Sequence, residues 1–164
     1  MRASTLVLII AVSTAPACSK SSKDKSDKSG PTPTRRIEPT DAEATEVTLN
    51  LKDIADAARD YQRGKGRYPV GKVGLTPGRS CCKNGDGRCN VMDAEWTDPV
   101  WQALAFKPFG TFRFQYSYES ADGMTFTATA ATYPACDGMP ITYQVSGRFV
   151  DGNAVLDEPA QVRL

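Results

Sequence analysis

The stretch FRFQYSYESADGMTFTATAAT, residues 112–132, decides the fold. Aromatic residues occupy every second position from Phe112 to Tyr118 with polar residues between them, which is the pattern of a half-buried strand. Asp122-Gly123 is typical of a tight turn, and the alternation of apolar and polar residues resumes from Met124 to Thr132. The stretch therefore predicts two antiparallel strands joined by a short turn.

The same alternation returns once more downstream. Residues 140–149, PITYQVSGRF, predict a third strand, and the sequence Asp-Gly-Asn at 151–153 predicts the turn after it. Consecutive strands with short turns form an antiparallel meander, and the apolar face of that meander needs a cover.

The segment before the strands supplies this cover. Thr40 followed by Glu43 is a capping box, which marks the start of a helix. Apolar residues then recur at spacings of four and three, as on one face of an amphipathic helix: Val47, Leu51, Ile54, Ala58 and Tyr61. We therefore expect an α+β fold for residues 37–164, in which one long amphipathic N-terminal helix, from about Asp41 to Arg63, packs on a small antiparallel sheet of three to four strands.

Residues 1–17 predict a signal peptide. The apolar run LVLIIAV at 6–12 is far shorter than the roughly 20 residues of a membrane-spanning helix. Small residues at 15–17 precede Cys18, and two interpretations of the cleavage follow. Ordinary cleavage after Ala17 leaves a secreted protein, whereas the lipobox of bacterial lipoproteins, which this segment resembles, leaves a lipidated Cys18 as the new N-terminus.

The cysteine count favours lipidation. The chain has five cysteines, and an exported protein with an odd number has a thiol to explain. With Cys18 carrying lipid, the other four form two disulfides in an oxidising compartment: Cys81, Cys82, Cys89 and Cys136. A bond between the adjacent Cys81 and Cys82 would be strained, so one of them pairs with Cys89 and the other with Cys136. Spacing does not choose between the two pairings.

Residues 18–36 predict a disordered basic tether behind the lipid anchor. The segment from Ser19 to Arg36 has no aliphatic residue, and its six Lys or Arg residues outnumber two Asp. It is either a solvated spacer or a segment attracted to anionic lipid headgroups. We expect the protein in the cell envelope, held by lipid to the outer membrane on its periplasmic face or at the cell surface.

Nothing in the sequence indicates an enzyme. The chain contains no histidine, which removes the commonest general base and metal ligand. A zinc site would need ligands such as Cys82, Cys89, Cys136 and Asp137, but exported four-cysteine domains are more often disulfide frameworks. Residues 84–87 lack the terminal Glu of an EF-hand and predict a turn, and Trp96, Trp101 and Phe106 predict a core cap more than a binding patch. No catalytic residue, cofactor, metal or nucleic-acid partner is expected.

The order of motifs along the chain resembles a known family. The motifs are the helix end followed by GRYP at 66–69, the Thr76-Pro77 pair before the adjacent cysteines, the two tryptophans, and the strand patterns at 112–118 and 126–130. In this order they resemble the periplasmic domain of type IV pilins and type II secretion pseudopilins, in particular a pilin-like group of deltaproteobacteria and myxobacteria. The match covers most of residues 40–150.

The resemblance implies a pilin-like globular domain at 37–164 on a lipid anchor. A true pilin begins with a long apolar helix that builds the filament, whereas this apolar segment is short and ends at Cys18. Pseudopilins can hold calcium near the position of Asp137, although the ligands do not line up here. The implied function is that of an interaction component of a pilus or type II secretion-type apparatus with an envelope protein as partner. We expect it to be non-enzymatic and, because its helix has a single apolar face, monomeric. The alternative is a stand-alone envelope binding module for a small ligand or polysaccharide.

Overall fold

The long helix begins and ends where its local signals predict. In the computed structural model, which describes residues 38–134, 136 and 139–163, α1 runs from Asp41 to Lys65. The Thr40 hydroxyl accepts a hydrogen bond from the Glu43 N–H at 3.3 Å, and the Glu43 carboxylate accepts one from the Thr40 N–H at 2.8 Å. These bonds satisfy donors that the first helical turn leaves free. Gly66 ends α1 in the left-handed region, at φ 73°.

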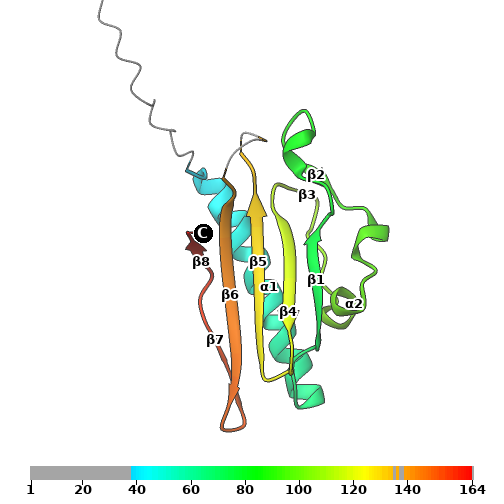
Figure 1. Ribbon diagram of the computed structural model, residues 1–164, viewed down its shortest axis with the longest axis vertical. Coiled ribbons are helices and arrows are strands. Elements are labelled where there is room, and N and C mark those ends of the chain that lie inside the picture. Colours follow the sequence, from blue (N-terminus) through cyan, green and yellow to red (C-terminus); the bar gives the residue numbers. More distant parts are fainter. Residues whose placement is uncertain (1–37, 135, 137–138, 164) are drawn as a thin grey trace, which may run out of the picture. The chain divides into compact units, whose positions relative to one another are not determined.

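Most strands belong to one antiparallel sheet. They are β1 (Gly71–Thr76), β4 (Gln115–Ser120), β5 (Thr125–Thr132), β6 (Ile141–Val150), β7 (Asn153–Leu156) and β8 (Ala160–Val162). Their order is β1-β4-β5-β6-β7, and β8 pairs with β6 beside β7 (Figure 1). The connection between β1 and β4 contains η1 (Cys81–Lys83), β2 (Cys89–Asn90), η2 (Asp93–Trp96), α2 (Pro99–Leu104) and β3 (Thr111–Phe112). In this connection β2 and β3 form a second, two-stranded sheet.

The predicted fold class is wrong. The described part of the chain is a sheet-rich fold with eight strands in two antiparallel sheets, not one helix on a sheet of three to four strands. The extra strands β2, β7 and β8 escaped prediction because they are two to four residues long, and β1 because it contains two glycines and a bulge between Val73 and Thr76. Segments this short or irregular show no period of two.

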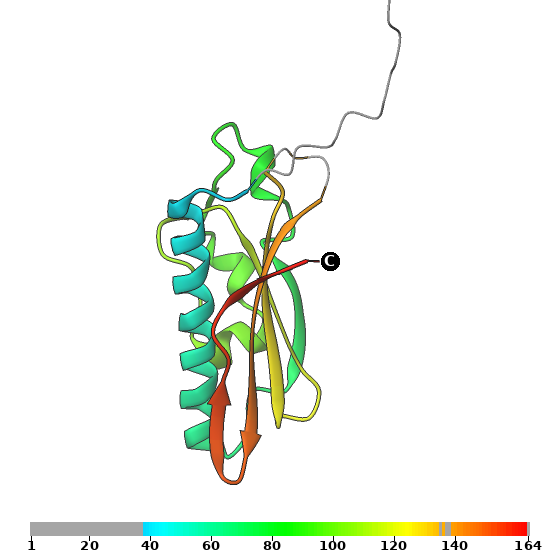
Figure 2. The ribbon, with the colours of Figure 1, turned by 90° about the vertical axis from the view of Figure 1, so that its left-hand side faces the viewer.

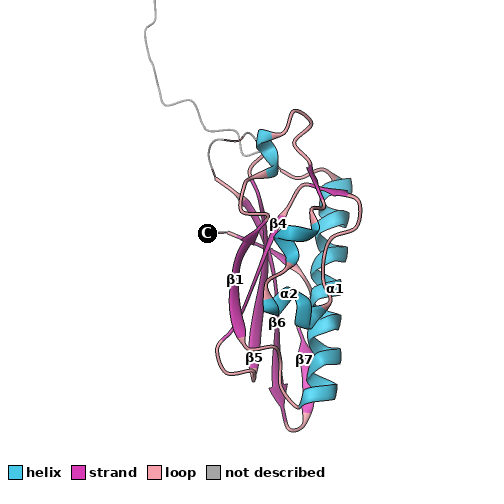
Figure 3. Ribbon diagram, turned by 90° about the vertical axis from the view of Figure 1, so that its right-hand side faces the viewer, coloured by secondary structure: helices cyan, strands magenta, loops and turns pink. Residues whose placement is uncertain are grey.

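The helices lie on one face of the large sheet. Figure 2 shows α1 running along this face, and Figure 3 shows α2 on the same side. The side chains of Val47, Leu51 and Ile54 are fully buried there, and burial of a Leu or Ile side chain stabilises a fold by about 1.5–3 kcal/mol. Ala128 and Ala130 on β5, a strand that α1 contacts, are fully buried as well.

Aromatic side chains fill the space beside α2. The ring centroids of Trp96 and Trp101 lie 5.5 Å apart, and Phe106 lies 5.7 Å from both Trp96 and Tyr116. The indole N–H of Trp101 donates to the Thr76 hydroxyl at 3.0 Å, so a buried polar atom finds its partner. The interpretation of Trp96, Trp101 and Phe106 as core residues is confirmed, since none is more than 7% exposed.

Candidate functional site

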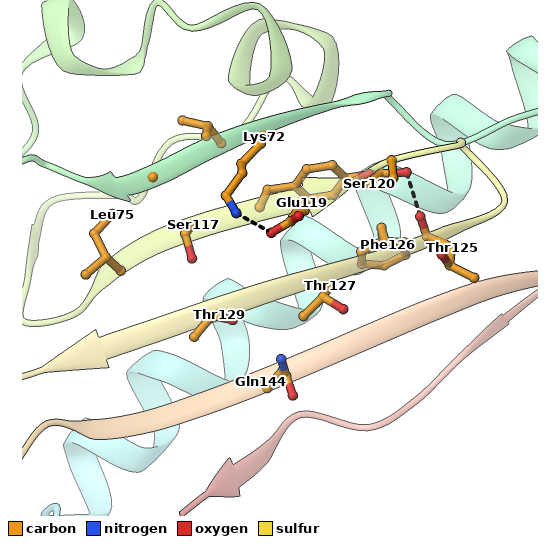
Figure 4. A pocket seen from close by; sticks show the side chains of 14 residues that line it. Lys72, Leu75, Ser117, Glu119, Ser120, Thr125, Phe126, Thr127, Thr129 and Gln144 are labelled. Carbon is orange, nitrogen blue, oxygen red and sulfur yellow. Dashed lines mark hydrogen bonds and ion pairs between the residues drawn. The ribbon is translucent and has the colours of Figure 1, made fainter. Parts of the chain in front are cut away.

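The face of the large sheet opposite α1 is polar and open. We call it the outer face and define it by seven side chains: Lys72, Ser117, Glu119, Thr125, Thr127, Thr129 and Gln144. No element of the described residues covers it, and it forms a shallow trough of about 620 Å³ across β1, β4, β5 and β6 (Figure 4). The same alternation that buries aromatic residues on the inner side places these side chains outside.

The strand register arranges these side chains in rows. In one row Ser117 pairs with Thr129, which pairs with Gln144 on β6. In the next row Lys72 pairs with Glu119, which pairs with Thr127. Hydroxyl, amide and charged groups therefore repeat along and across the strands at the spacing of the sheet, which is the geometry needed to hydrogen-bond an extended or flat ligand.

The charges on the outer face are paired with each other. Lys72 Nζ lies 2.9 Å from Glu119 Oε2, and both side chains are more than half exposed. An exposed pair of this kind contributes only about 0–1 kcal/mol to stability. It places one cation and one anion at the β1 side of the trough. At the other side of the sheet, beyond the trough, Arg148 Nη1 lies 3.5 Å from Asp157 Oδ1.

Hydrogen bonds hold the turn between β4 and β5, which lies at one end of the trough. The Asp122 carboxylate accepts hydrogen bonds from the N–H groups of Met124 and Thr125, and these bonds lower the pKa of Asp122. The Ser120 hydroxyl donates to the Thr125 carbonyl and accepts from the Gly123 N–H. Gly123 has φ 75°, a conformation that glycine adopts without strain.

The disulfides are Cys81–Cys89 and Cys82–Cys136, with Cα separations of 4.9 and 5.3 Å. This is one of the two pairings that the spacing left open. The backbone of η1 turns Cys81 into the core, where it is 1% exposed and meets the buried Cys89. Cys82 faces the other way and reaches Cys136 after the end of β5. Three of the candidate zinc ligands are thus used in disulfides, while Asp137 lies outside the described residues.

Two carboxylates of α1 tie this helix to the connection between β1 and β4. Glu46 accepts a hydrogen bond from the Arg113 N–H at 2.7 Å and lies 3.8 Å from Arg88, and Glu43 lies 3.3 Å from the Arg113 guanidinium. Burial raises the pKa of Glu46 by more than its backbone hydrogen bonds and Arg88 lower it. Burial also raises the pKa of Glu43, but the hydrogen bonds from Thr40 and the charge of Arg113 lower it by more, so the pKa of Glu43 is lowered overall.

A second cavity, of about 490 Å³, lies near these groups, between the start of α1, the segment 82–87 and the end of β5. Thr40, Glu43, Cys82 and Arg113 are among its lining residues. Of its charged groups, Glu43 and Arg113 are paired with each other, while Glu38 and Asp86 add two further carboxylates to its lining.

The outer face is lined by hydroxyl, amide and charged groups. Its groups donate and accept hydrogen bonds, and it has neither a thiol nor an imidazole. Among residues 38–134, 136 and 139–163, no group of three or more His, Cys, Asp or Glu side chains lies together as a metal site would require. None of the helices within these ranges is long and apolar enough to cross a membrane.

Sequence reasoning missed the outer face, although its signal was present. Several polar positions between the aromatic and alanine residues of 112–132 line it, among them Ser117, Thr127 and Thr129. The predicted lipid attachment at Cys18, the signal peptide and the tether fall outside the described residues and stay predictions.

Comparison with family models, with curated proteins and with solved structures finds no match to this chain. The resemblance to pilins therefore stands on the order of sequence motifs.

Proposed function

We propose that this protein is a non-enzymatic lipoprotein of the cell envelope, anchored through Cys18, that binds another envelope protein. The observation that supports this proposal is the outer face, because one side of the sheet is packed under α1 (Figure 3) while the other is polar and uncovered by any described element. The two disulfides fit a protein that folds in an oxidising compartment.

The side chains of the outer face suit a protein contact. Serine and threonine lose little conformational entropy when a partner orders them, compared with lysine or glutamate. The ion pairs Lys72–Glu119 and Arg148–Asp157 lie toward two sides of the sheet, where charges set the orientation of a partner more than its affinity. From the motif order we propose a subunit of a pilus or type II secretion-type apparatus as the partner.

A pull-down from detergent-solubilised membranes tests this proposal. Thr127→Arg places a bulky cation in the middle of the outer face, and Leu49→Arg places the same side chain on α1 at a residue that is 58% exposed. We expect wild type and Leu49→Arg to recover pilus or secretion subunits and Thr127→Arg to lose them. Recovery that survives Thr127→Arg would place the interface elsewhere, and no recovery by any form would contradict the proposed partner.

A stand-alone binding module for a small ligand or polysaccharide is the second candidate. It is favoured by the hydroxyl and amide groups that line the trough, since these are the groups that hydrogen-bond to sugars. Retention of the protein on insoluble envelope polysaccharide, lost in Thr127→Arg and kept in Leu49→Arg, would support this candidate over the first.

A further inference from the structure

The two disulfides share adjacent cysteines but differ in exposure. Cys81 and Cys89 are 1% and 3% exposed and belong to the core. Cys136 is exposed, and Cys82 is half-buried and lines the cavity of about 490 Å³ beside the start of α1. A thiol in solution therefore has access to one disulfide and not to the other.

A hydroxyl group donates a hydrogen bond to one sulfur of the accessible disulfide. The Ser80 hydroxyl lies 3.1 Å from Cys82 Sγ and donates a hydrogen bond to it. A donor at this place stabilises negative charge on the sulfur, so it stabilises the Cys82 thiolate that forms when the bond breaks. In thiol–disulfide exchange, a leaving thiolate that is better stabilised leaves faster.

We propose that Cys82–Cys136 is a site of thiol–disulfide exchange with a dithiol reductant, while Cys81–Cys89 is a permanent structural bond. An external thiolate attacks the exposed Cys136 Sγ and forms a mixed disulfide with it. The bond between the two protein sulfurs breaks, and Cys82 Sγ leaves with the electron pair as a thiolate held by Ser80. The second thiol of the reductant then attacks the reductant sulfur that is bonded to Cys136, and Cys136 is released as a thiolate. Two electrons pass from the dithiol, which becomes a disulfide.

The exchange would uncouple two distant parts of the chain. Cys82 follows β1 and Cys136 follows β5, and their bond spans 54 positions in sequence, against 8 for Cys81–Cys89. Reduction would remove this long-range link while Cys81–Cys89 still holds η1 to β2. The inference is independent of the proposed partner, because it concerns the disulfides alone.

Differential alkylation tests this proposal on the full oxidised chain in detergent. The protein is exposed to dithiothreitol for increasing times, quenched with acid and alkylated, and the labelled cysteine peptides are quantified by mass spectrometry. We expect Cys82 and Cys136 to be labelled at least about tenfold faster than Cys81 and Cys89 under native conditions. In guanidinium chloride the difference should shrink to about twofold or less, because both disulfides are then exposed. Equal native rates, or faster loss of Cys81–Cys89, would overturn the proposal.

Two further measurements test the direction of attack and the role of Ser80. With glutathione as a monothiol probe, the trapped mixed disulfide should be on Cys136, and a mixed disulfide on Cys82 would overturn the direction. Ser80→Ala should slow native reduction and raise the pKa of the reduced Cys82 thiol, measured by the pH dependence of its alkylation. Thr97→Ala removes a hydroxyl that donates to the Ala94 carbonyl, away from the sulfur atoms, and is the matched control. An unchanged rate and pKa in Ser80→Ala would overturn its role.

Discussion

Gly147 on β6 pairs with Phe126 on β5, and the Phe126 ring occupies the space where a Cβ at position 147 would stand. On the β7 side, that Cβ would lie 2.8 Å from Leu156 Cδ2. Any side chain at position 147 would therefore have to displace the Phe126 ring and the Leu156 side chain.

Gly147→Ala should destabilise the protein by about 1–3 kcal/mol, the usual cost of overpacking a core. Urea unfolding followed by tryptophan fluorescence measures the loss. Gly85→Ala is the control, because no atom lies within 4 Å of the added Cβ there. Equal stability of the two variants would show that the Phe126 and Leu156 side chains move aside without cost.

Thr76→Val should cost about 1–3 kcal/mol, because it keeps the shape of the side chain but leaves the buried indole N–H of Trp101 without an acceptor. The measurement is again the urea midpoint. Thr45→Val removes an exposed hydroxyl that donates to the Asp41 carbonyl and should be nearly neutral. A neutral Thr76→Val would mean that water or another acceptor replaces Thr76.

The two α1 carboxylates should have opposite effects on the pH dependence of stability. The folded pKa of Glu46 is raised above its ordinary value of 4.5, so its contribution is fully present below that value and is lost as the pH rises through the folded pKa. The folded pKa of Glu43 is lowered, so its contribution is present above 4.5 and is lost as the pH falls through the folded pKa.

In Glu46→Gln, the free energy of unfolding should therefore fall less as the pH rises above 4.5. In Glu43→Gln, it should fall less as the pH drops below 4.5. Urea midpoints measured between about pH 3 and 8 separate the two effects. Changes of the same sign in both variants would contradict the assignment.

Cys18→Ala should move the protein from the membrane fraction to the soluble periplasm or medium, since several acyl chains at about 0.8 kcal/mol per buried CH₂ would be lost. Cell fractionation and immunoblotting measure the distribution, with Cys81→Ala as a control that removes a different cysteine. Membrane association that persists in Cys18→Ala would contradict the lipid anchor.

Residues 37–164 without the tether should be monomeric at micromolar concentration. The apolar face of α1 is used by the sheet, and α2 packs at the start of the edge strand β1, where Val100 lies against Gly71. Light scattering measures the mass. If larger species form, Phe109→Ser is the informative variant, because Phe109 is 99% exposed and is the largest apolar side chain available for such a contact in the described part of the chain.

Local signals decided what the sequence could predict. The capping box at Thr40 and the apolar face of α1 lie within one helix, and the alternation in β5 and β6 lies within single strands. The predicted strand at 111–118 is instead split into β3 and β4. Between them the Arg113 N–H donates to the carboxylate of Glu46, 67 positions earlier, and not to a neighbouring strand. The disulfide pairing also depended on tertiary structure, since only the turn of η1 directs Cys81 inward.

The outer face shows why a candidate binding surface is harder to predict than a fold. Thr127 and Thr129 alternate with alanines as in any sheet that is solvated on one side, so their pattern carries no sign of a partner. What distinguishes the site is the alignment of Ser117, Thr129 and Gln144 across three strands. That alignment depends on the register, which residue spacing within one strand does not reveal.

The C-terminal residues protect the strand beside them. β6 pairs along one edge with β5, while its other edge is shared by β7 at Gly147–Val150 and β8 at Thr142–Gln144. The Asp157 N–H bonds to the Ser146 carbonyl between them, at 2.9 Å. Proteolytic removal of the residues after Val150 would leave a ten-residue strand with a free edge, and such an edge is a template for aggregation. Short, interrupted β7 and β8 cover that edge without offering a long one of their own, so an affinity tag or a truncation at the C-terminus should leave Ala160–Val162 intact.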